Sequence, residues 1–284
     1  MIHKHLGYSE MSDRTVLITG TSSGIGLATA VAAARGGWHV IATMRNTAKA
    51  DALLAAATEA GVTVEVRALD VTDPASVSAC LVGLDRLDAL VNNAGAGHLG
   101  TLEQESVDAV RAVMEVNFFG VLNVTKAALP LLRASRGRVL TVTSVGGVVG
   151  QPFNEAYCAA KFAVEGFMES LAPVAATAGV SVSVVEPGAV ASEFVANVGL
   201  TDDAPRQAGP YAPALVAYLD RTRGAFAHAQ APEDVAARIL GLLTAERPAF
   251  RLLTSDAARA FAGTKLKDLD GSAVQALTAG WVAP

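Results

Sequence analysis

The hydrophobic residues of this chain fall into short β-branched runs that alternate with longer stretches of helical periodicity. The short runs predict strands at residues 15–20, 39–45, within 62–73, and at 87–95, 137–144, 180–188 and 249–255. The longer stretches predict helices at residues 26–37, 48–61, 74–83, 102–135, 157–176 and 232–246. This alternation is typical of a parallel sheet with right-handed crossover helices. We therefore predict an α/β fold, a single-domain, Rossmann-like, doubly wound parallel sheet of about seven strands with helices on both faces.

Three regions depart from this rhythm. Residues 189–231 form a connection too long for a compact domain, which favours a lid over a substrate. The tail from 256 to 284 is rich in small residues and weakly patterned. Residues 1–12 read as a flexible extension, in which the His-Lys-His of residues 3–5 is interpreted as solvated rather than metal-binding. The remaining residues, 13–284, are predicted to form one dinucleotide-binding catalytic domain.

Composition excludes several classes of protein. Half of the 284 residues are hydrophobic (51%) and 17% are charged, so the chain can bury a large core. A net charge of −5 and the lack of a basic tract argue against a nucleic-acid partner. Cys80 and Cys158 have no paired spacing, which predicts neither disulfide nor metal site and fits a reducing compartment. With no signal peptide and no apolar run of about 18 residues, we expect a cytoplasmic protein without a membrane span.

The stretch TGTSSGIG (residues 19–26) lies directly between the first predicted strand and the first predicted helix. Gly20 would permit the sharp turn, Gly24 would let the backbone approach a pyrophosphate, and Gly26 would let the helix pack closely on the sheet. The amide groups at the start of that helix would then face the phosphates. This placement favours a nucleotide site over the alternative, an ordinary glycine-rich turn.

A second motif, YCAAK, places Tyr157 and Lys161 four residues apart on one face of a helix. A free tyrosine has a pKa of about 10, too high for efficient acid–base catalysis at neutral pH. A neighbouring ammonium group would lower that pKa. We interpret the two residues as a candidate acid–base pair, provided that they face the bound nucleotide, the alternative being two exposed surface residues.

The glycine spacing, Gly-x-x-x-Gly-x-Gly, resembles that of the short-chain dehydrogenase/reductase family. NNAG (92–95), Asn117, Ser144, YCAAK and PGAVAS (187–192) follow in the same order, so the resemblance covers roughly residues 14 to 255. It implies that Tyr157 exchanges the substrate proton and that Lys161 tunes Tyr157 and holds the nicotinamide ribose. It further implies that Ser144 binds the substrate oxygen and that Asn117 holds a water in a proton relay.

The resemblance also implies a set of cofactor contacts. They are Gly20, Ser22, Ser23, Gly24, Ile25, Gly26, Arg45, Asp70, Val71, Asn92, Ala94, Gly95, Tyr157, Lys161, Pro187, Gly188, Val190 and Ser192. The second strand ends without the acidic residue that binds the ribose of NAD and is followed by Arg45, which suits a 2′-phosphate. We therefore predict a preference for NADP(H) over NAD(H); the alternative is that Arg45 is simply solvated.

Within the family, the chain resembles the hydroxysteroid and retinol dehydrogenase branch, which implies a lipophilic alcohol or ketone as substrate. Candidate substrate contacts are Ser144, Val148, Val149, Phe153, Phe194 and Phe226, with His98 and Glu155 as polar candidates. Arg221 stands where a steroid-specific member would carry a histidine, so steroid specificity is not predicted. A homodimer or homotetramer is implied.

Two other functions compete with this hypothesis. A 3-oxoacyl-type ketoreductase of fatty-acid or polyketide metabolism would meet an acidic carrier protein, for which Arg206, Arg221 and Arg223 offer a small basic rim. A non-catalytic nucleotide-sensing protein would use the fold only for binding. The complete set of Asn117, Ser144, Tyr157 and Lys161 argues against this second alternative.

Overall fold

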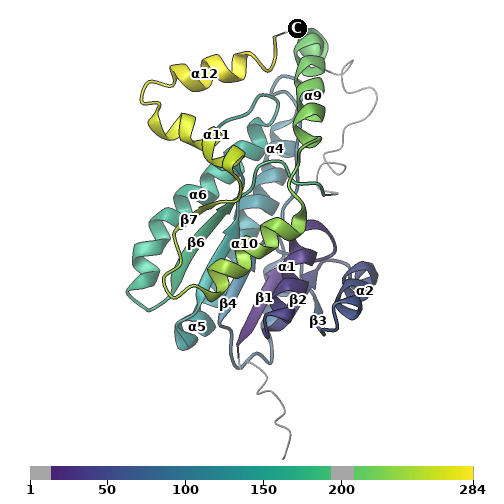
Figure 1. Cartoon of the computed structure of the whole chain (residues 1–284), viewed down its shortest axis with the longest axis vertical. Coiled ribbons are helices and arrows are strands. Elements are labelled where there is room, and N and C mark those ends of the chain that lie inside the picture. Colours follow the sequence, from purple (N-terminus) through teal and green to yellow (C-terminus); the bar gives the residue numbers. More distant parts are fainter. Residues whose placement is uncertain (1–13, 193–207, 284) are drawn as a thin grey trace, which may run out of the picture.

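The computed structural model describes residues 14–192 and 208–283, and its centre is a seven-stranded sheet (Figure 1). The strands are β1 (Thr15–Thr19), β2 (His39–Met44), β3 (Glu65–Ala68), β4 (Ala89–Asn92), β5 (Arg138–Val142), β6 (Ser181–Glu186) and β7 (Arg251–Leu253). Their order is β3-β2-β1-β4-β5-β6-β7, and every neighbouring pair is parallel. The predicted doubly wound fold is confirmed, with a third strand shorter than its predicted region.

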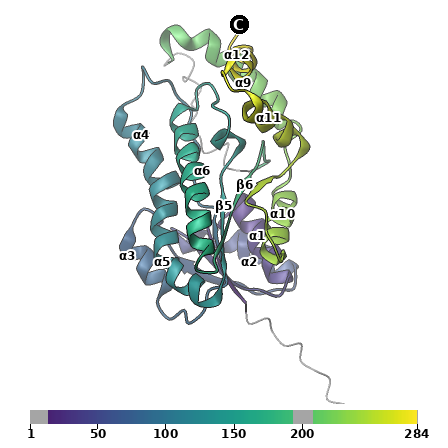
Figure 2. The same ribbon diagram turned by 90° about the vertical axis from the view of Figure 1, so that its left-hand side faces the viewer.

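Helices cover both faces of the sheet (Figure 2). The described helices are α1 (Gly24–Arg35), α2 (Asp51–Glu59), α3 (Pro74–Leu81), α4 (Val107–Met114), α5 (Gly120–Ser135), α6 (Glu155–Ala176), α9 (Ala212–Phe226), α10 (Pro232–Thr244), α11 (Asp256–Lys267) and α12 (Ser272–Ala279). Figure 2 shows α3, α5 and α6 on one face, with α1, α2 and α10 on the other. Both faces are therefore shielded from water, as an all-parallel sheet requires.

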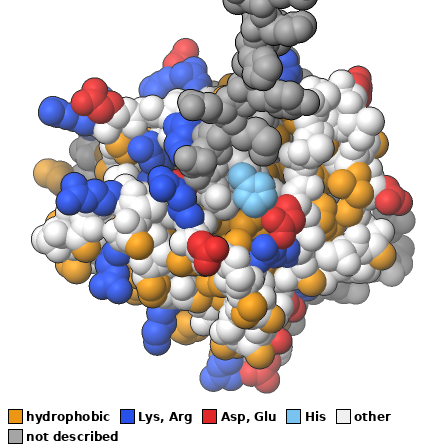
Figure 3. Space-filling model, turned by 90° about the horizontal axis from the view of Figure 1, so that it is seen from below, with side chains coloured by type: hydrophobic (Ala, Val, Ile, Leu, Met, Phe, Trp, Pro, Cys, Tyr) orange, Lys and Arg blue, Asp and Glu red, His pale blue; other side chains and the backbone are white. Residues whose placement is uncertain are grey.

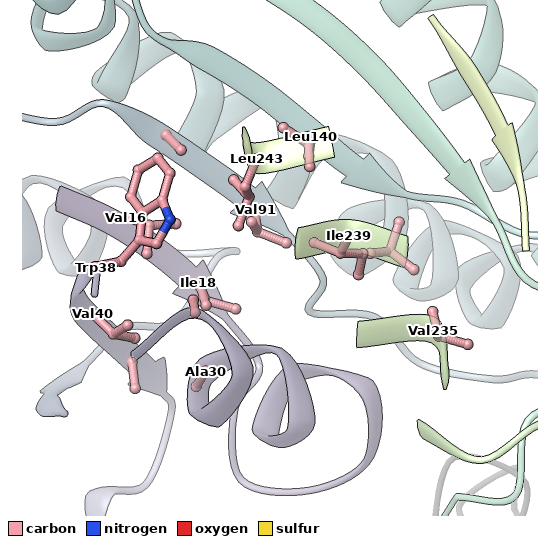
Figure 4. Packing of buried hydrophobic residues seen from close by; sticks show 14 of the residues in the cluster. Val16, Ile18, Ala30, Trp38, Val40, Val91, Leu140, Val235, Ile239 and Leu243 are labelled. Atoms are coloured by element: carbon pink, nitrogen blue, oxygen red, sulfur yellow. The ribbon is translucent and has the colours of Figure 1, made fainter. Parts of the chain in front are cut away.

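Alternating side chains of each strand supply the two cores. In β1, Val16 and Ile18 pack with α1 and α10, whereas Leu17 packs with the helices of the opposite face. Figure 4 shows the first core, where Ile239 and Leu243 of α10 meet the sheet. Full burial of such a side chain contributes about 2 kcal/mol. Because both faces are covered, β1 and β4 in the middle of the sheet are buried along their whole length.

The helical stretch predicted at residues 102–135 is one continuous helix with an irregularity in its middle. A π-helical turn (Glu115–Phe119) joins α4 to α5. By length and composition alone, Val107–Ser135 would suffice to cross a membrane, which the sequence prediction did not anticipate. Val124, Ala128 and Leu132 of this helix pack on the sheet, so burial in the core accounts for its apolar face.

In the described part of the lid predicted at residues 189–231, a short turn at Gly209–Tyr211 leads into α9. Phe194 and Arg206 lie outside the described residues, as do the predicted extension at 1–12 and its histidines. The weakly patterned tail, for which no element was predicted, forms α11 and α12. We use the name "cap" for α9, α11, α12 and residues 280–283.

The cap lies at the end of the sheet where the strands finish (Figure 1). Ala262 of α11 and Val274 of α12 pack on Val148 and Val149, just after β5. Figure 3 looks at the opposite end, where the strands begin and where positively charged side chains gather toward one side. The carboxyl ends of the strands, and with them the candidate site, face the cap.

Candidate active site

The candidate site is built at the point where the strand order reverses, between β1 and β4. Ligands of doubly wound sheets bind in the crevice outside the carboxyl ends of strands at such a point. The glycine loop follows β1, the NNAG motif follows β4, Ser144 follows β5 and Pro187 follows β6. Chain topology therefore brings the four predicted motifs to one edge.

Close contacts with neighbouring atoms require glycine at key positions of the glycine loop. Gly20 has a positive φ of 71°, and a Cβ on it would lie 2.8 Å from the Cα of Ala94. A Cβ on Gly26 would lie 2.1 Å from the carbonyl oxygen of Gly20, so only glycine allows α1 to approach the loop. A Cβ on Gly24 would reach the side chain of Ser192, which places this predicted cofactor contact over the loop.

The same loop fits a pyrophosphate. Ser23 is the N-cap of α1, yet its hydroxyl makes no capping bond, so the first amides of the helix keep their hydrogen-bonding capacity for a ligand. Ser22 and Ile25, also predicted contacts, are half-buried beside it. The exposed amides, the dipole of α1 and the missing Cβ atoms together suit a nicotinamide dinucleotide, which these residues would hold by its phosphates.

Asn93 and Thr19 brace this loop, and the sequence reasoning missed both. The side-chain amide of Asn93 donates to the carbonyls of Thr19 (2.9 Å) and Gly20 (3.0 Å). The hydroxyl of Thr19 accepts from the amides of Asn93 and Ala94. The neighbouring Asn92 instead points into the core, where it donates to Thr125. The alternation of a strand, which turns successive side chains to opposite faces, was the signal that separates the two asparagines.

On the adenine side of the site, the predicted contacts are Asp70, Val71 and Arg45, and contacts with other residues hold some of them in place. Asp70 uses one carboxylate oxygen to accept from the amide and the hydroxyl of Thr72. These bonds hold the pKa of Asp70 below its usual value, and the nearby guanidinium of Arg45 adds to the effect. Val71 is buried beside Gly120, so it is a packing residue as well as a predicted contact. Arg45 itself is exposed just beyond β2.

On the nicotinamide side, loops from two strands hold each other. Val145, next to Ser144, donates its amide to the carbonyl of Pro187 (2.9 Å). Val190 forms a bridge with Gln230, which fixes the start of the predicted lid. Gly188, between these anchors, has only Ala258 near the place a Cβ would take. The predicted segment 187–192 therefore lies against both the catalytic loop and the cap.

Ser144, Tyr157 and Lys161 converge as predicted. The hydroxyl of Ser144 accepts from the amide of Gly146 (3.0 Å) and is hydrogen-bonded to Tyr157. The ammonium of Lys161 donates to the carbonyl of Val142 (3.1 Å) and lies 5.8 Å from the centre of the Tyr157 ring. It also lies 3.6 Å from where a Cβ on Gly95 would be, so it faces the predicted cofactor segment.

The pKa values of this pair differ from the sequence expectation. Burial raises the pKa of Tyr157 above its usual value, and the hydrogen bond from Ser144 opposes only part of the rise. Burial also lowers the pKa of Lys161 to about 8, against the opposing charge of Glu165. Desolvation disfavours both charged forms, so in the protein alone the pKa of the phenol is raised rather than lowered. Burial likewise raises the pKa of the Cys158 thiol to about 11, consistent with a packing role.

Asn117 reaches the site through the π-helical turn. Its side chain is fully buried, donates to the carbonyls of Ala96 (2.9 Å) and Val113 (3.1 Å), and accepts from the amide of Ala96. A water of a proton relay would therefore bind the backbone beside Asn117 rather than its occupied amide group. π-helical turns free backbone carbonyls from the regular ladder, which makes this possible.

The predicted substrate contacts separate into two groups. Val148 and Val149 are buried against α11 and α12, so they support the cap. Phe153, with a positive φ of 61°, packs on Tyr218 of α9 at 5.6 Å and borders a cavity of about 310 Å³. Glu155, Tyr211, Ala214 and Val282 also line this cavity. Trp281 belongs to the same hydrophobic cluster as Phe153 and Tyr218, although the sequence reasoning named no residue of the tail at 256–284.

The remaining candidates have other partners or lie apart. His98 pairs with Glu105 at 2.6 Å. Arg221 stacks over the ring of Trp281 at 4.3 Å, so its charge is engaged within the cap. Phe226 is half-buried at the end of α9. In residues 14–192 and 208–283, no group of three His, Cys, Asp or Glu side chains is close enough to hold a metal ion.

A doubly wound sheet with a glycine loop and a Ser-Tyr-Lys constellation defines a nicotinamide-dependent oxidoreductase. A model of the short chain dehydrogenase family matches residues 14–203. Retinol dehydrogenase 8 of Homo sapiens is 40% identical over 270 residues, which span 91% of this chain and 86% of that protein. The 17-beta-hydroxysteroid dehydrogenase type 1 of Mus musculus is 40% identical over 273 residues, which span 92% and 79%.

Comparison with solved structures indicates the same family. The crystal structure of a short-chain dehydrogenase from Streptomyces avermitilis matches with a TM-score of 0.74 and 31% identity, over 95% of this chain and 96% of that one. This chain belongs to the short-chain dehydrogenase family, and it is an oxidoreductase that acts on CH–OH donors with a nicotinamide cofactor.

Proposed function

We propose that the protein is an NADP(H)-dependent oxidoreductase that transfers a hydride between nicotinamide and a lipophilic secondary alcohol or ketone. The observation that carries this proposal is the position of Tyr157, which is hydrogen-bonded to Ser144 and lies beside Lys161. The apolar cap packs on Val148 and Val149, a few residues after Ser144. A bulky carbonyl compound that enters under the cap would meet the phenol at the cofactor edge.

The side chains divide the chemistry among them. Ser144 and Tyr157 would hold the substrate oxygen between their hydroxyls, and Tyr157 would give it a proton as the carbonyl is reduced, or take one as the alcohol is oxidised. Lys161 would stabilise the phenolate and bind the ribose. When bound, the cofactor supplies the hydride and, in its oxidised form, a positive charge that offsets the raised pKa of Tyr157.

The cofactor preference depends on Arg45. It is exposed beyond β2, its charge reaches Asp70, and a guanidinium there could bind a 2′-phosphate with two hydrogen bonds. We expect Arg45→Ala to reduce kcat/KM for NADPH by about 10²-fold, with little change for NADH. The matched control is Arg35→Ala, at the far end of α1. Equal losses with both cofactors, or none, would remove the NADP(H) proposal.

The substrate class is supported by the chemistry of the cap. Phe153, Tyr218 and Trp281 line one apolar cluster, and relatives at 40% identity are named for retinol and for a hydroxysteroid. The test is a series of ketones of increasing size, followed by the absorbance of the reduced nicotinamide. We expect kcat/KM to rise with apolar area. A flat series, or a preference for small charged ketones, would argue against a lipophilic substrate.

The ketoreductase alternative has little support from the described residues. Arg221 is stacked on Trp281 and Arg223 pairs with Asp220, so neither charge is presented freely to an acidic carrier. Arg206 lies outside the described residues. A preference for 3-oxoacyl thioesters over simple lipophilic ketones in the same series would restore this alternative.

We further propose that the protein is a homo-oligomer. Phe119, Phe162 and Phe167 are each about two-fifths exposed on the outer side of the α5–α6 layer. Three exposed aromatic rings on neighbouring elements are unusual for a surface in contact with water and suit a second copy of this chain. Light scattering on the purified protein gives the mass, and a monomeric mass would contradict the proposal.

A further inference from the structure

A cluster of buried charges lies behind Lys161, and the mechanism above leaves it unused. Glu165 follows Lys161 by one turn of α6, so Tyr157, Lys161 and Glu165 share one face of the helix. Glu165 is 5% exposed, and Glu186, the last residue of β6, is fully buried. Arg251, the first residue of β7, is the cation between them. Burying two carboxyl groups beside each other is costly, which calls for an explanation.

The geometry of the cluster is specific. Arg251 donates to Oε1 of Glu186, and its other nitrogen lies 3.3 Å from Oε2 of Glu165. Both oxygens of Glu165 and Oε2 of Glu186 are buried without a hydrogen-bond donor of good geometry. α6 is held close to this cluster because a Cβ on Gly147 would lie 3.0 Å from the Cγ of Glu165. A single proton shared between one oxygen of Glu165 and Oε2 of Glu186 would join two of these three oxygens, and Arg251 lies 3.3 Å from Oε2 of Glu165.

The pKa shifts of Glu165 and Glu186 have the direction expected of two buried carboxyl groups that share a proton. Burial and the neighbouring charge of Glu165 raise the pKa of Glu186 to about 8, and burial raises the pKa of Glu165 as well. Two interacting acids lose their protons in two separate steps, so one proton remains on the pair near neutral pH. The pair with that proton carries one negative charge.

That negative charge faces Lys161. Glu165 is the group that opposes the effect of burial on the Lys161 pKa. The other titratable or charged groups around Lys161 and Glu165 are Tyr157 and Cys158 on α6, Glu186 on β6 and Arg251 on β7. The neutral carbonyl of Val142, at the end of β5, approaches Lys161, and the hydroxyl of Thr143, the next residue, approaches Glu165.

We propose that Glu165 is a positioning residue that keeps Lys161 charged at the cofactor edge. In this proposal Glu186 shares a proton with Glu165, and Arg251 is the cation that holds both carboxyl groups in place. The proposal rests on the role of Lys161 in the proposed function. It gives the charge cluster a purpose that stability alone does not, because a well-packed apolar cluster would be at least as stable.

The first test measures Lys161 without turnover. The chain has few lysines, so labelled lysine side chains can be titrated by NMR, and Lys161→Met identifies the signal. We expect Glu165→Gln to lower the pKa of Lys161 by about one unit, because an opposite charge nearby favours the ammonium. Glu186→Gln should leave that pKa unchanged or raise it, since Glu165 then keeps its charge without sharing a proton.

The second test follows kcat/KM against pH. Activity that needs the ammonium falls as pH rises through the pKa of Lys161, so the fall should begin about one pH unit lower in Glu165→Gln. This corresponds to a loss of about fivefold at pH 8 and little change at pH 6. Glu165→Asp keeps the charge and should restore the profile. Glu169→Gln, the same change on an exposed position of α6, should match the wild type.

Several outcomes would overturn the proposal. One is an unchanged Lys161 pKa in Glu165→Gln, and another is a fall of equal size in Glu186→Gln. A uniform loss of activity at all pH values would indicate a merely structural role. If Glu165→Gln does not fold, Glu186→Gln still decides, because a lowered Lys161 pKa in that variant contradicts the proposal. Full turnover in Lys161→Met would contradict the proposed function instead, while the titration of Lys161 would stand by itself.

Discussion

The cofactor edge and the cap lie next to each other but are held together in different ways. At the cofactor edge, glycines fill places where a Cβ would come within 2.1 Å (Gly26) or 2.8 Å (Gly20) of backbone atoms. In the cap, nothing lies within 4 Å of the place a Cβ would take on Gly224, Gly263 or Gly271. Steric contacts therefore restrict which residues the backbone of the cofactor edge can carry, whereas the backbone of the cap has space around it.

Hydrogen bonding shows the same contrast. Asn93 and Asn117 each tie the cofactor edge together with several bonds to backbone atoms. The cap is joined to the sheet mainly by apolar contacts, among them Phe153 with Tyr218 and Ala262 with Val149. Apolar contacts tolerate exchange of side chains better than buried hydrogen bonds do. The chemistry of the enzyme is thus fixed in one region, while its substrate range is open to change in the other.

The largest expected effect comes from the phenol at the boundary of the two regions. Tyr157→Phe should reduce kcat by about 10³-fold, because it removes the hydroxyl to which we assign the proton transfer. The Kd for NADPH, measured by fluorescence, should change by less than about twofold. Tyr218→Phe is the control from the cap. It loses the hydrogen bonds of its hydroxyl with Asn154 and Thr222, both within the cap and its support, so it should keep most of the activity. Unchanged turnover in Tyr157→Phe would refute the acid–base role.

The glycines test the contrast directly. Gly26→Ala should lower the free energy of unfolding by about 2–3 kcal/mol and weaken NADPH binding, because the added methyl group meets the backbone of Gly20. Gly263→Ala, inside α11, should instead stabilise the protein by about 0.5–1 kcal/mol, since it meets nothing and favours the helix. Urea denaturation measures both. Similar effects of the two changes would erase the distinction between the regions.

The smallest expected effect is confined to the cap. Phe153→Ala should reduce kcat/KM for the largest ketones by about tenfold, because it removes apolar area next to the cavity. Small ketones and the Kd for NADPH should be little affected. The ratio of kcat/KM values between large and small ketones is the readout. If Phe153→Ala weakened NADPH binding as much as ketone reduction, the cap and the cofactor edge would have to be treated as one unit.

Much of the cofactor edge could be predicted because its signals are local. The glycine spacing, the pair Tyr157 and Lys161, and the alternating strands and helices are all patterns over fewer than about twenty residues. Backbone geometry converts such patterns into structure with little help from distant contacts. The fold class and the convergence of the predicted motifs followed from them.

Other features had no local signal. The tail folds into α11 and α12 because Ala262 and Val274 find Val148 and Val149, residues more than a hundred positions earlier. The raised pKa of Tyr157 depends on how deeply the folded chain buries it.

The sequence by itself determined the parallel sheet, the glycine loop and the helical spacing that puts Tyr157 and Lys161 on one face. Only the tertiary structure decided which asparagine braces the loop, which residues face the cavity and that Glu165, Glu186 and Arg251 meet behind Lys161. The physical reason is that burial and charge act through space. Their effects depend on neighbours that the chain brings together only when it is folded.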